Sequence, residues 1–404
     1  MRSIQILGRA YSIPTIMAAF AVMGFIAVVV PSGTSFAATK TWVGTDCPTT
    51  DCYWSNGNNW QGGAAPVNGD DIVITSNAVT PDAFDGTLND ISNLSVKNIA
   101  VSGYAKSANS YMTISNTIGN ATALTITGNV TYVAPVVAAP SGWYAAERLA
   151  IDHNTITLGA DSIFTQVSFT ASNTLNLNGH ALTYIRTLGD GAGTTVGLSP
   201  TITGNGTLNI DVPLTTALFM KGVNTYSGVT NINTVDYVNS SDVPNVAMFG
   251  TSVVNLSSQG RILFEADGAQ AINNTINVTP PTVSGTFLSN QLEFWSGSAA
   301  VTYTVPNLHL LGNARFGVNV INGAVTVNLA GIVVNGHCVQ YGDGNGQAAN
   351  FLNGPSACVV NVSGTPATPN TGAQIVFGNP IVVGVLGLAA AATVVFLARR
   401  TAKN

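Results

Sequence analysis

The chain has 404 residues, of which 46% are hydrophobic and only 8% are charged, whereas soluble domains usually carry about 25% charged residues. Gly, Ser, Thr and Asn take their place, and these residues favour strands and turns over long surface helices. Between the two apolar ends, eight Lys and Arg stand against all 18 Asp and Glu, a net charge of −10. Such an acidic region argues against nucleic-acid binding, which needs a basic surface, so we expect no nucleic-acid partner.

The first 37 residues are typical of a signal peptide. Two basic residues, Arg2 and Arg9, precede an uncharged apolar run over 13–30. A helix-breaking segment follows over 31–34. Small residues at Ser35 and Ala37 fit the positions that signal peptidase recognises, so we expect cleavage after Ala37 and a mature chain that starts at Ala38. The apolar run is long for a signal peptide, and the alternative is an uncleaved membrane anchor.

The segment after the signal peptide combines three tryptophans with a turn before the first strand. The residues are Trp42, Trp54, Trp60, Pro66, Gly69 and Asp70, followed by the apolar run 72–74. This pattern resembles the cap that often opens the passenger domains of autotransporter adhesins. The resemblance implies a capped β-helix whose first coil after the cap includes 89–96.

Residues 38–365 show no long amphipathic helical pattern. Short alternating runs predict strands, and segments rich in Gly, Asn and Asp predict turns between them. The strands include 72–74, 94–96, 124–126, 175–177, 208–210 and 325–327, and the turns 127–129, 178–180 and 204–206. Because the runs recur about every 20 to 30 residues, stacked coils that bury their apolar faces explain them best.

The predicted fold class is therefore all-β, and specifically a right-handed parallel β-helix or solenoid. Asn and Thr side chains would stack between its coils as ladders. The alternative is a β-sandwich or an array of small sandwiches.

A repeat-like motif at 221–232 reads KGVNTYSGVTNI. It resembles the passenger-associated repeat of autotransporter adhesins, whose core reads G-x-N-T-Y-x-G-x-T-x-I. The motif residues carried over are Asn224, Thr225, Tyr226, Gly228, Thr230 and Ile232. The resemblance implies that Asn224 and Gly228 shape turns, that Tyr226 packs inside, and that Thr230 begins the next strand.

Four cysteines lie in the exported region, at Cys47, Cys52, Cys338 and Cys358. Local pairing predicts the disulfides Cys47–Cys52 and Cys338–Cys358, although four cysteines allow three connectivities and the sequence leaves the others open. The second bridge would close a loop of about 20 residues and stabilise the fold by roughly 3 kcal/mol. The alternative is a metal site of His337 with Cys338 and Cys358. Because no further Cys or His lies nearby and an exported chain favours disulfides, we expect neither a metal nor a cofactor.

Catalysis on a β-helix would need clustered carboxylates, because acid and base must flank one glycosidic bond. The candidates are Asp152 with His153, Asp190, and Glu265 with Asp267. None forms a recognisable motif, and Asp190 and Asp267 both precede Gly, as in turns where Asp caps its own backbone. The loop 343–346 is similar to a calcium loop but lacks its further carboxylates and terminal Glu. We therefore predict no catalytic residues.

The chain ends in an uncharged run over 381–398, whose 18 residues would form a helix of about 27 Å, close to a bilayer core of roughly 30 Å. Arg399, Arg400 and Lys403 follow and predict a cytoplasmic tail, so the body would lie outside the cell. The alternative is a buried core helix. An autotransporter would end instead in a membrane β-barrel, so the passenger-like body here would have a different anchor.

A pentapeptide before this run, Thr368-Pro369-Asn370-Thr371-Gly372, resembles the LPxTG sorting signal of Gram-positive surface proteins. The resemblance implies that a sortase cysteine attacks the Thr371 carbonyl, cuts before Gly372, and passes the chain to a cell-wall amine. Thr368 replaces the Leu that fills a sortase pocket in that family. The alternative is a Pro/Thr stalk on a permanent membrane anchor, and both interpretations place the body at the cell surface.

The predicted organisation has six parts. They are a signal peptide (1–37), a cap (38–75), a solenoid body (76–365), a stalk with the sorting-like motif (366–380), a transmembrane helix (381–398) and a basic cytoplasmic tail (399–404).

These features predict a non-catalytic surface protein, an adhesin or structural component anchored by its C-terminus. Its partners would be the membrane, a sortase and the cell wall, and the surfaces or glycans of other cells. The alternatives are a carbohydrate-active enzyme on a β-helix, either a polysaccharide lyase or a hydrolase, and a purely structural surface-layer component.

Overall fold

The structure is a computed structural model, and it describes most of the chain between residues 37 and 358. The described residues are 37–47, 52–75, 87–105, 111–116, 123–133, 144–145, 148–169, 173–186, 196–212, 217–220, 222–234, 237–239, 247–280, 291–319, 323–342, 351–355 and 357–358. The predicted signal peptide apart from Ala37, and the sorting-like motif, transmembrane helix and tail, lie outside these ranges. Within them the protein is all-β and contains no α-helix, only the 3₁₀ turns η2 (Gly57–Asn59) and η4 (Ala247–Phe249).

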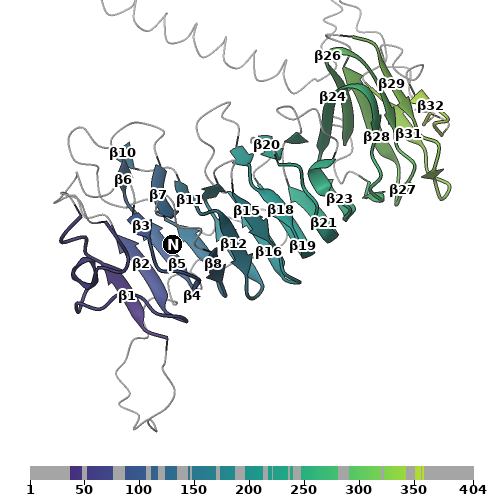
Figure 1. The fold of residues 1–404 in the computed structure, drawn as a ribbon. Helices are drawn as coiled ribbons and strands as arrows, with labels where there is room; N and C mark the ends of the chain where they lie inside the picture. The colour runs from purple at the N-terminus through teal and green to yellow at the C-terminus, as the bar shows by residue number, and fades with distance from the viewer. Residues whose placement is uncertain are drawn as a thin grey trace, which may run out of the picture. The chain divides into compact units, whose positions relative to one another are not determined.

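One parallel sheet runs through the whole described region and takes one strand from each successive coil (Figure 1). Its twelve strands, in order, are β1 (Thr39–Trp42), β2 (Asp71–Thr75), β5 (Ile99–Ser102), β9 (Val130–Tyr132), β13 (Ser162–Thr165), β16 (Ala181–Ile185), β19 (Asn205–Asp211), β21 (Ser227–Thr234), β23 (Val253–Gln259), β25 (Ile276–Val278), β27 (Leu308–Leu310) and β30 (Ile332–Val333). Parallel neighbours that are one coil apart in sequence are what a solenoid requires.

Two shorter parallel sheets belong to the first half of the coils. One contains β3 (Thr87–Asn89), β7 (Tyr111–Asn116), β11 (Arg148–Asp152) and β14 (Val167–Phe169). The other, the hydroxyl sheet, contains β4 (Leu94–Val96), β8 (Ala123–Ile126), β12 (Thr155–Leu158), β15 (Thr174–Asn176) and β18 (Thr201–Thr203). A small antiparallel pair joins β6 (Tyr104–Ala105) to β10 (Tyr144–Ala145).

A nine-stranded parallel sheet belongs to the second half. It contains β17 (Val196–Leu198), β20 (Ala217–Met220), β22 (Tyr237–Asn239), β24 (Ile262–Ala271), β26 (Leu292–Thr304), β28 (Ala314–Asn319), β29 (Val325–Asn328), β31 (Val339–Tyr341) and β32 (Phe351–Leu352). The prediction of an all-β fold is thus confirmed, and its parallel sheets are consistent with a β-solenoid. An array of sandwiches would instead give mainly antiparallel pairing.

The alternating sequence pattern explains the core. In β12, Ile156 and Leu158 are buried while Thr155 and Thr157 are half-exposed, because successive strand residues point to opposite faces. Inward residues of successive coils stack in register in the twelve-stranded sheet. One such stack runs through Ile72, Ile99, Val130, Phe164, Tyr184, Ile210, Ile232, Leu256, Val278 and Leu310. Each buried side chain of this size contributes roughly 1.5–3 kcal/mol, so the stack is a main source of stability.

The three tryptophans of the predicted cap pack against one another. The ring centroids of Trp42 and Trp60 lie 4.9 Å apart in an edge-to-face arrangement, and those of Trp54 and Trp60 lie 5.6 Å apart in the same arrangement. All three are at most 2% exposed. The indole of Trp54 donates to Thr87 Oγ1 at 2.9 Å, which joins the cap to β3.

The predicted strand segments fall in strands, except that β15 ends at Asn176 and leaves Leu177 outside, and one predicted turn is wrong. The segment 204–206 was expected to be a turn, whereas Asn205 and Gly206 lie inside β19 and only Gly204 forms a bend. Gly206 pairs in register with Gly228 of the next coil. A Cβ on Gly206 would lie 2.3 Å from the carbonyl oxygen of His180, so the small residue serves close coil packing here.

Candidate binding surface

A ladder of asparagine amides runs across the outward face of the twelve-stranded sheet. Asn231 Nδ2 donates to Asn209 Oδ1 at 2.8 Å, and Asn255 Nδ2 donates to Asn231 Oδ1 at 2.9 Å. Asn277 Nδ2 donates to Asn255 Oδ1 at 2.8 Å. We call these four residues the asparagine ladder. Its members are half-buried, and their strand neighbours point inward into the core.

Backbone register makes the ladder possible. The four residues occupy matching positions in β19, β21, β23 and β25, and parallel strands lie about 4.8 Å apart. An amide can therefore donate to the same amide one coil away. At one end Asn209 Nδ2 donates to Thr183 Oγ1 at 3.2 Å, and at the other end His309 stands in register with Asn277.

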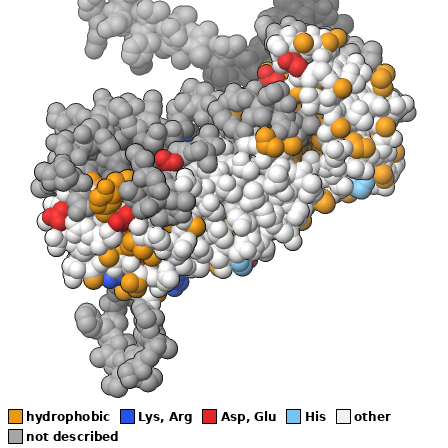
Figure 2. Space-filling view, in the orientation of Figure 1, with side chains coloured by type: hydrophobic (Ala, Val, Ile, Leu, Met, Phe, Trp, Pro, Cys, Tyr) orange, Lys and Arg blue, Asp and Glu red, His pale blue; other side chains and the backbone are white. Residues whose placement is uncertain are grey.

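The hydroxyl sheet presents a second neutral polar face. Two columns of half-exposed side chains cross its outward face. One column contains Ala123, Thr155, Thr174 and Thr201, and the other contains Ser95, Thr125, Thr157, Asn176 and Thr203. Charged residues are absent from both columns. Figure 2 agrees, since the side chains over the middle coils on the face it shows are mostly neither charged nor hydrophobic.

The repeat-like motif forms a buried polar network at the start of β21. Asn224 is 3% exposed, and its amide bridges three coils. It accepts from Ile202 N at 2.7 Å and donates to Met248 O at 2.7 Å. Asn224 therefore satisfies two backbone groups that would otherwise be buried without a partner.

Tyr226 continues this network inside the coil stack. Its side chain is fully buried, and its hydroxyl lies 2.5 Å from Thr230 Oγ1, which in turn lies 2.7 Å from Ser252 Oγ. Burial raises the pKa of Tyr226 to about 12. Thr225 is exposed, and Gly228 lies inside β21, not in a turn. The motif is thus a packing unit between coils.

The carboxylate candidates fall on different sheets. Asp152 ends β11 and is followed by His153, which is buried and whose carbonyl oxygen accepts a hydrogen bond from Asn173 Nδ2. Glu265 and Asp267 lie on β24 in the nine-stranded sheet. Asp190 lies outside the described residues.

Asp267 caps the neighbouring coil, not its own backbone as expected. Its carboxylate accepts from Ser298 Oγ at 2.6 Å, Ser298 N at 2.7 Å and Ala299 N at 2.9 Å. The hydrogen bond from the Ser298 hydroxyl, followed by those from the two backbone amides, lowers the pKa of Asp267. This carboxylate therefore holds the part of β26 where its pairing with β24 shifts register.

Sequence reasoning missed one charged pair beside these candidates. Arg261 Nη2 lies 3.4 Å from Glu293 Oε2, and both side chains are less than a fifth exposed. Glu293 is one strand away from Glu265, which stands in register with Trp295. Only the coil register brings residues 32 positions apart together, and no local sequence motif signals it.

Both disulfides that local pairing predicts are present, Cys47–Cys52 and Cys338–Cys358. They leave neither Cys338 nor Cys358 as a thiolate, so the alternative of a metal site with His337 is not supported. No group of three or more His, Cys, Asp or Glu side chains within the described ranges could hold a metal ion. The loop 343–346 lies outside those ranges.

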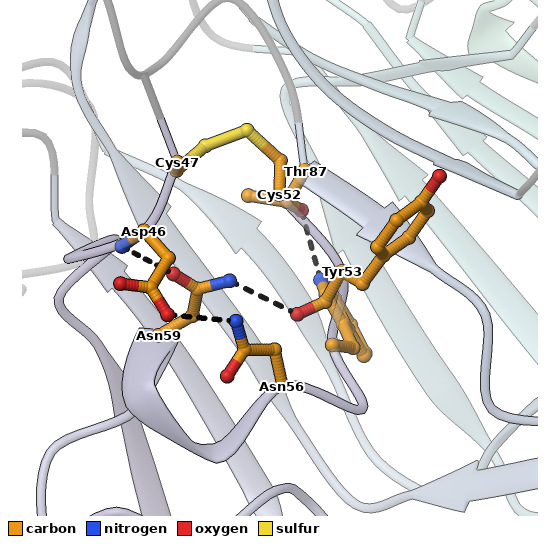
Figure 3. Close-up of a disulfide and its surroundings, with 8 residues drawn as sticks. Asp46, Cys47, Cys52, Tyr53, Asn56, Asn59 and Thr87 are labelled. Atoms are coloured by element: carbon orange, nitrogen blue, oxygen red, sulfur yellow. Dashed lines mark hydrogen bonds between the residues drawn. A yellow bond between two sulfur atoms is a disulfide. The ribbon is translucent and has the colours of Figure 1, made fainter. Parts of the chain in front are cut away.

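Figure 3 shows how the first disulfide stands among polar contacts in the cap. Asp46 N donates to Asn59 Oδ1 at 3.0 Å, and Asn59 Nδ2 donates to Tyr53 O at 3.2 Å. Asn56 Nδ2 donates to the Asp46 carboxylate at 2.9 Å, and this bond, with one from Asn58, lowers the Asp46 pKa. These contacts join the segment before Cys47 to the segment after Cys52.

Comparisons with protein-family models, with curated proteins and with solved structures find no match. Among the described residues no helix is long and apolar enough to cross a membrane. A functional proposal therefore rests on the geometry of the described residues. Their most regular outward features are the asparagine ladder and the hydroxyl columns.

Proposed function

We propose that this chain is a non-catalytic surface protein that binds neutral glycans through the outward faces of a right-handed β-solenoid. The observation that carries the proposal is the asparagine ladder. In it Asn231 and Asn255 each use one N–H and one oxygen lone pair along the ladder, and the second N–H and second lone pair of these amides would meet a ligand. Sugar hydroxyls both donate and accept, so they complement such a row.

Repetition would compensate for weak individual contacts. A row of equivalent groups, one per coil, lets a polymer with repeating hydroxyls bind at several points at once, and linked weak contacts give high avidity. Charge contributes little on these faces, so we expect binding to be nearly insensitive to salt. An adhesin or a structural surface component would both use such a surface.

The export and anchoring parts of the proposal rest on the sequence of the two ends. We propose that a signal peptidase removes residues 1–37 and that a sortase joins Thr371 to the cell wall. Mass spectrometry of cell-wall digests should find a peptide that ends at Thr371 and carries wall material. Recovery of only the intact chain in detergent would support a permanent membrane anchor instead.

The binding part is tested with the purified exported region on a panel of neutral and acidic polysaccharides. Beads coated with the protein should attach to cells or to a neutral glycan, with no release of reducing or unsaturated sugar ends. Release of such ends would favour the carbohydrate-active enzyme. Neither attachment nor release would favour a structural coat role.

A further inference from the structure

Asp70 is a buried carboxylate immediately before β2, the strand that pairs with β1 of the first coil. The residue is 1% exposed and lies between the Gly69 turn and β2. Its Oδ1 accepts from the backbone nitrogen of Ala38 at 2.9 Å, and its Oδ2 accepts from the backbone nitrogen of Val67 at 2.9 Å. Both oxygens are thus bound by backbone N–H groups from two separate segments.

The contact with Ala38 holds the edge of the twelve-stranded sheet. β1 is its first strand and pairs with β2 alone within it. Ala38 comes immediately before β1, and its carbonyl oxygen accepts from Asp71 N at 2.9 Å. The backbone of Ala38 is therefore fixed on both sides, while the residues Ala37 and Ala38 are themselves exposed.

We propose that the mature chain begins at Ala38 and that its α-ammonium group forms an ion pair with Asp70. This inference rests on the proposed export and adds a role for the processed end. Cleavage after Ala37 would turn the nitrogen that already lies 2.9 Å from Asp70 Oδ1 from an amide into an ammonium group. The carboxylate acceptor already makes this bond charge-assisted, and an ammonium donor would add the attraction between two opposite charges, so processing would tighten the first coil.

Other ionisable groups on the adjoining elements are few. Asp71 stands beside Thr39 in the sheet, Lys40 lies in β1, and Lys97 donates its backbone nitrogen to the Asp70 carbonyl. Asp71 Oδ1 already accepts from Asn98 Nδ2 at 2.7 Å. Asp71 is therefore a matched control for the general effect of a nearby negative charge.

The test uses the chain with its C-terminal tail, exported by a Gram-positive host that lacks a sortase and purified in detergent. N-terminal sequencing should show a start at Ala38, and a different start would overturn the proposal. The reactivity of the terminal amine towards an acetylating reagent near neutral pH is then followed by mass spectrometry, relative to Lys97. A neighbouring carboxylate favours the charged, unreactive amine, so we expect the wild-type amine to react at least ~3-fold more slowly than that of Asp70→Asn. Asp71→Asn should react like the wild type.

A second variant guards against misfolding of Asp70→Asn. One extra Ala inserted between Ala37 and Ala38 leaves the cleavage sequence unchanged and moves the amine about 3.8 Å along the chain. Its amine should react as fast as that of Asp70→Asn. Equal rates in the wild type and the insertion variant would overturn the ion pair. Attachment to glycans is not part of this readout, so its outcome is separable from that of the proposed function.

Discussion

The hydroxyl group of Tyr226, which immediately precedes β21, lies 2.5 Å from Oγ1 of Thr230 in that strand. Thr230 also contacts Ser252 of the next coil at 2.7 Å, so the motif joins its own coil to a neighbour. Removing the two partners should therefore have unequal costs. Tyr226→Phe removes the hydroxyl from this network but leaves Thr230 its contact with Ser252, so it should lower the free energy of unfolding by about 1 kcal/mol. Thr230→Val leaves the buried Tyr226 hydroxyl without this partner and should cost about 1–3 kcal/mol. Chemical denaturation at neutral pH measures both, and a larger cost for Tyr226→Phe would contradict the network.

Tyr226 also predicts a loss of stability in alkali. Burial raises its pKa from the ordinary 10.0 to about 12, so the folded state keeps the proton that the unfolded state gives up. The stability contribution is full below pH 10 and falls as pH rises towards about 12. Tyr303 and Tyr341 also have raised pKa values through burial, and both remain in Tyr226→Phe. The stability gap between wild type and Tyr226→Phe should therefore shrink between about pH 9 and about pH 11. A constant gap would count against a protonated, buried Tyr226.

Gly228 shows why small residues mark coil contacts. Its φ is +109°, and a Cβ there would lie 2.1 Å from the carbonyl oxygen of Gly206. Backbone strain alone should make Gly228→Ala less stable by ~1–3 kcal/mol, and the clash with the Gly206 carbonyl oxygen should add to this cost. Gly179 is the control, because its φ is also positive, at +86°, but a Cβ would meet nothing within 4 Å. Equal effects of the two substitutions on the denaturation midpoint would show that the close approach is unimportant.

Asp267 should stabilise the register shift between β24 and β26 in a pH-dependent way. Hydrogen bonds from Ser298 and Ala299 lower its pKa below 3.8, so its contribution is present above that pH and is lost as pH falls through the lower, folded pKa. The protection factors of the Ser298 and Ala299 amides, which are exchange rates corrected for their intrinsic pH dependence, should fall in acid. Asp267→Asn should lower these protection factors at every pH, whereas Asp46→Asn, in the N-terminal cap, should leave them unchanged. High protection of both amides in Asp267→Asn would refute this role of Asp267.

The sequence predicted the strands where hydrophobic alternation is strict, as at 124–126, because period-two burial determines which face a side chain occupies. It predicted that Asn and Thr side chains would form ladders between coils, but it could not identify which residues belong to them. The asparagine ladder aligns residues separated by 22, 24 and 22 positions, and those separations depend on turns whose lengths vary. The pairing of Arg261 with Glu293 depends on the same register. Asp267 was assigned to its own turn for this reason, although its partners lie one coil further on.

The ladder is the feature on which the functional account depends, so substitution within it is the most direct test. Asn231→Ala removes two ladder bonds, whereas Asn233→Ala changes an exposed side chain on the same strand outside the ladder. Both variants should keep the β-rich circular dichroism spectrum of the wild type. Beads coated with each variant are then compared for attachment to the neutral glycan that the wild type binds. We predict that Asn231→Ala loses most of the attachment and that Asn233→Ala keeps it. Equal attachment by Asn231→Ala and the wild type would contradict binding through the ladder.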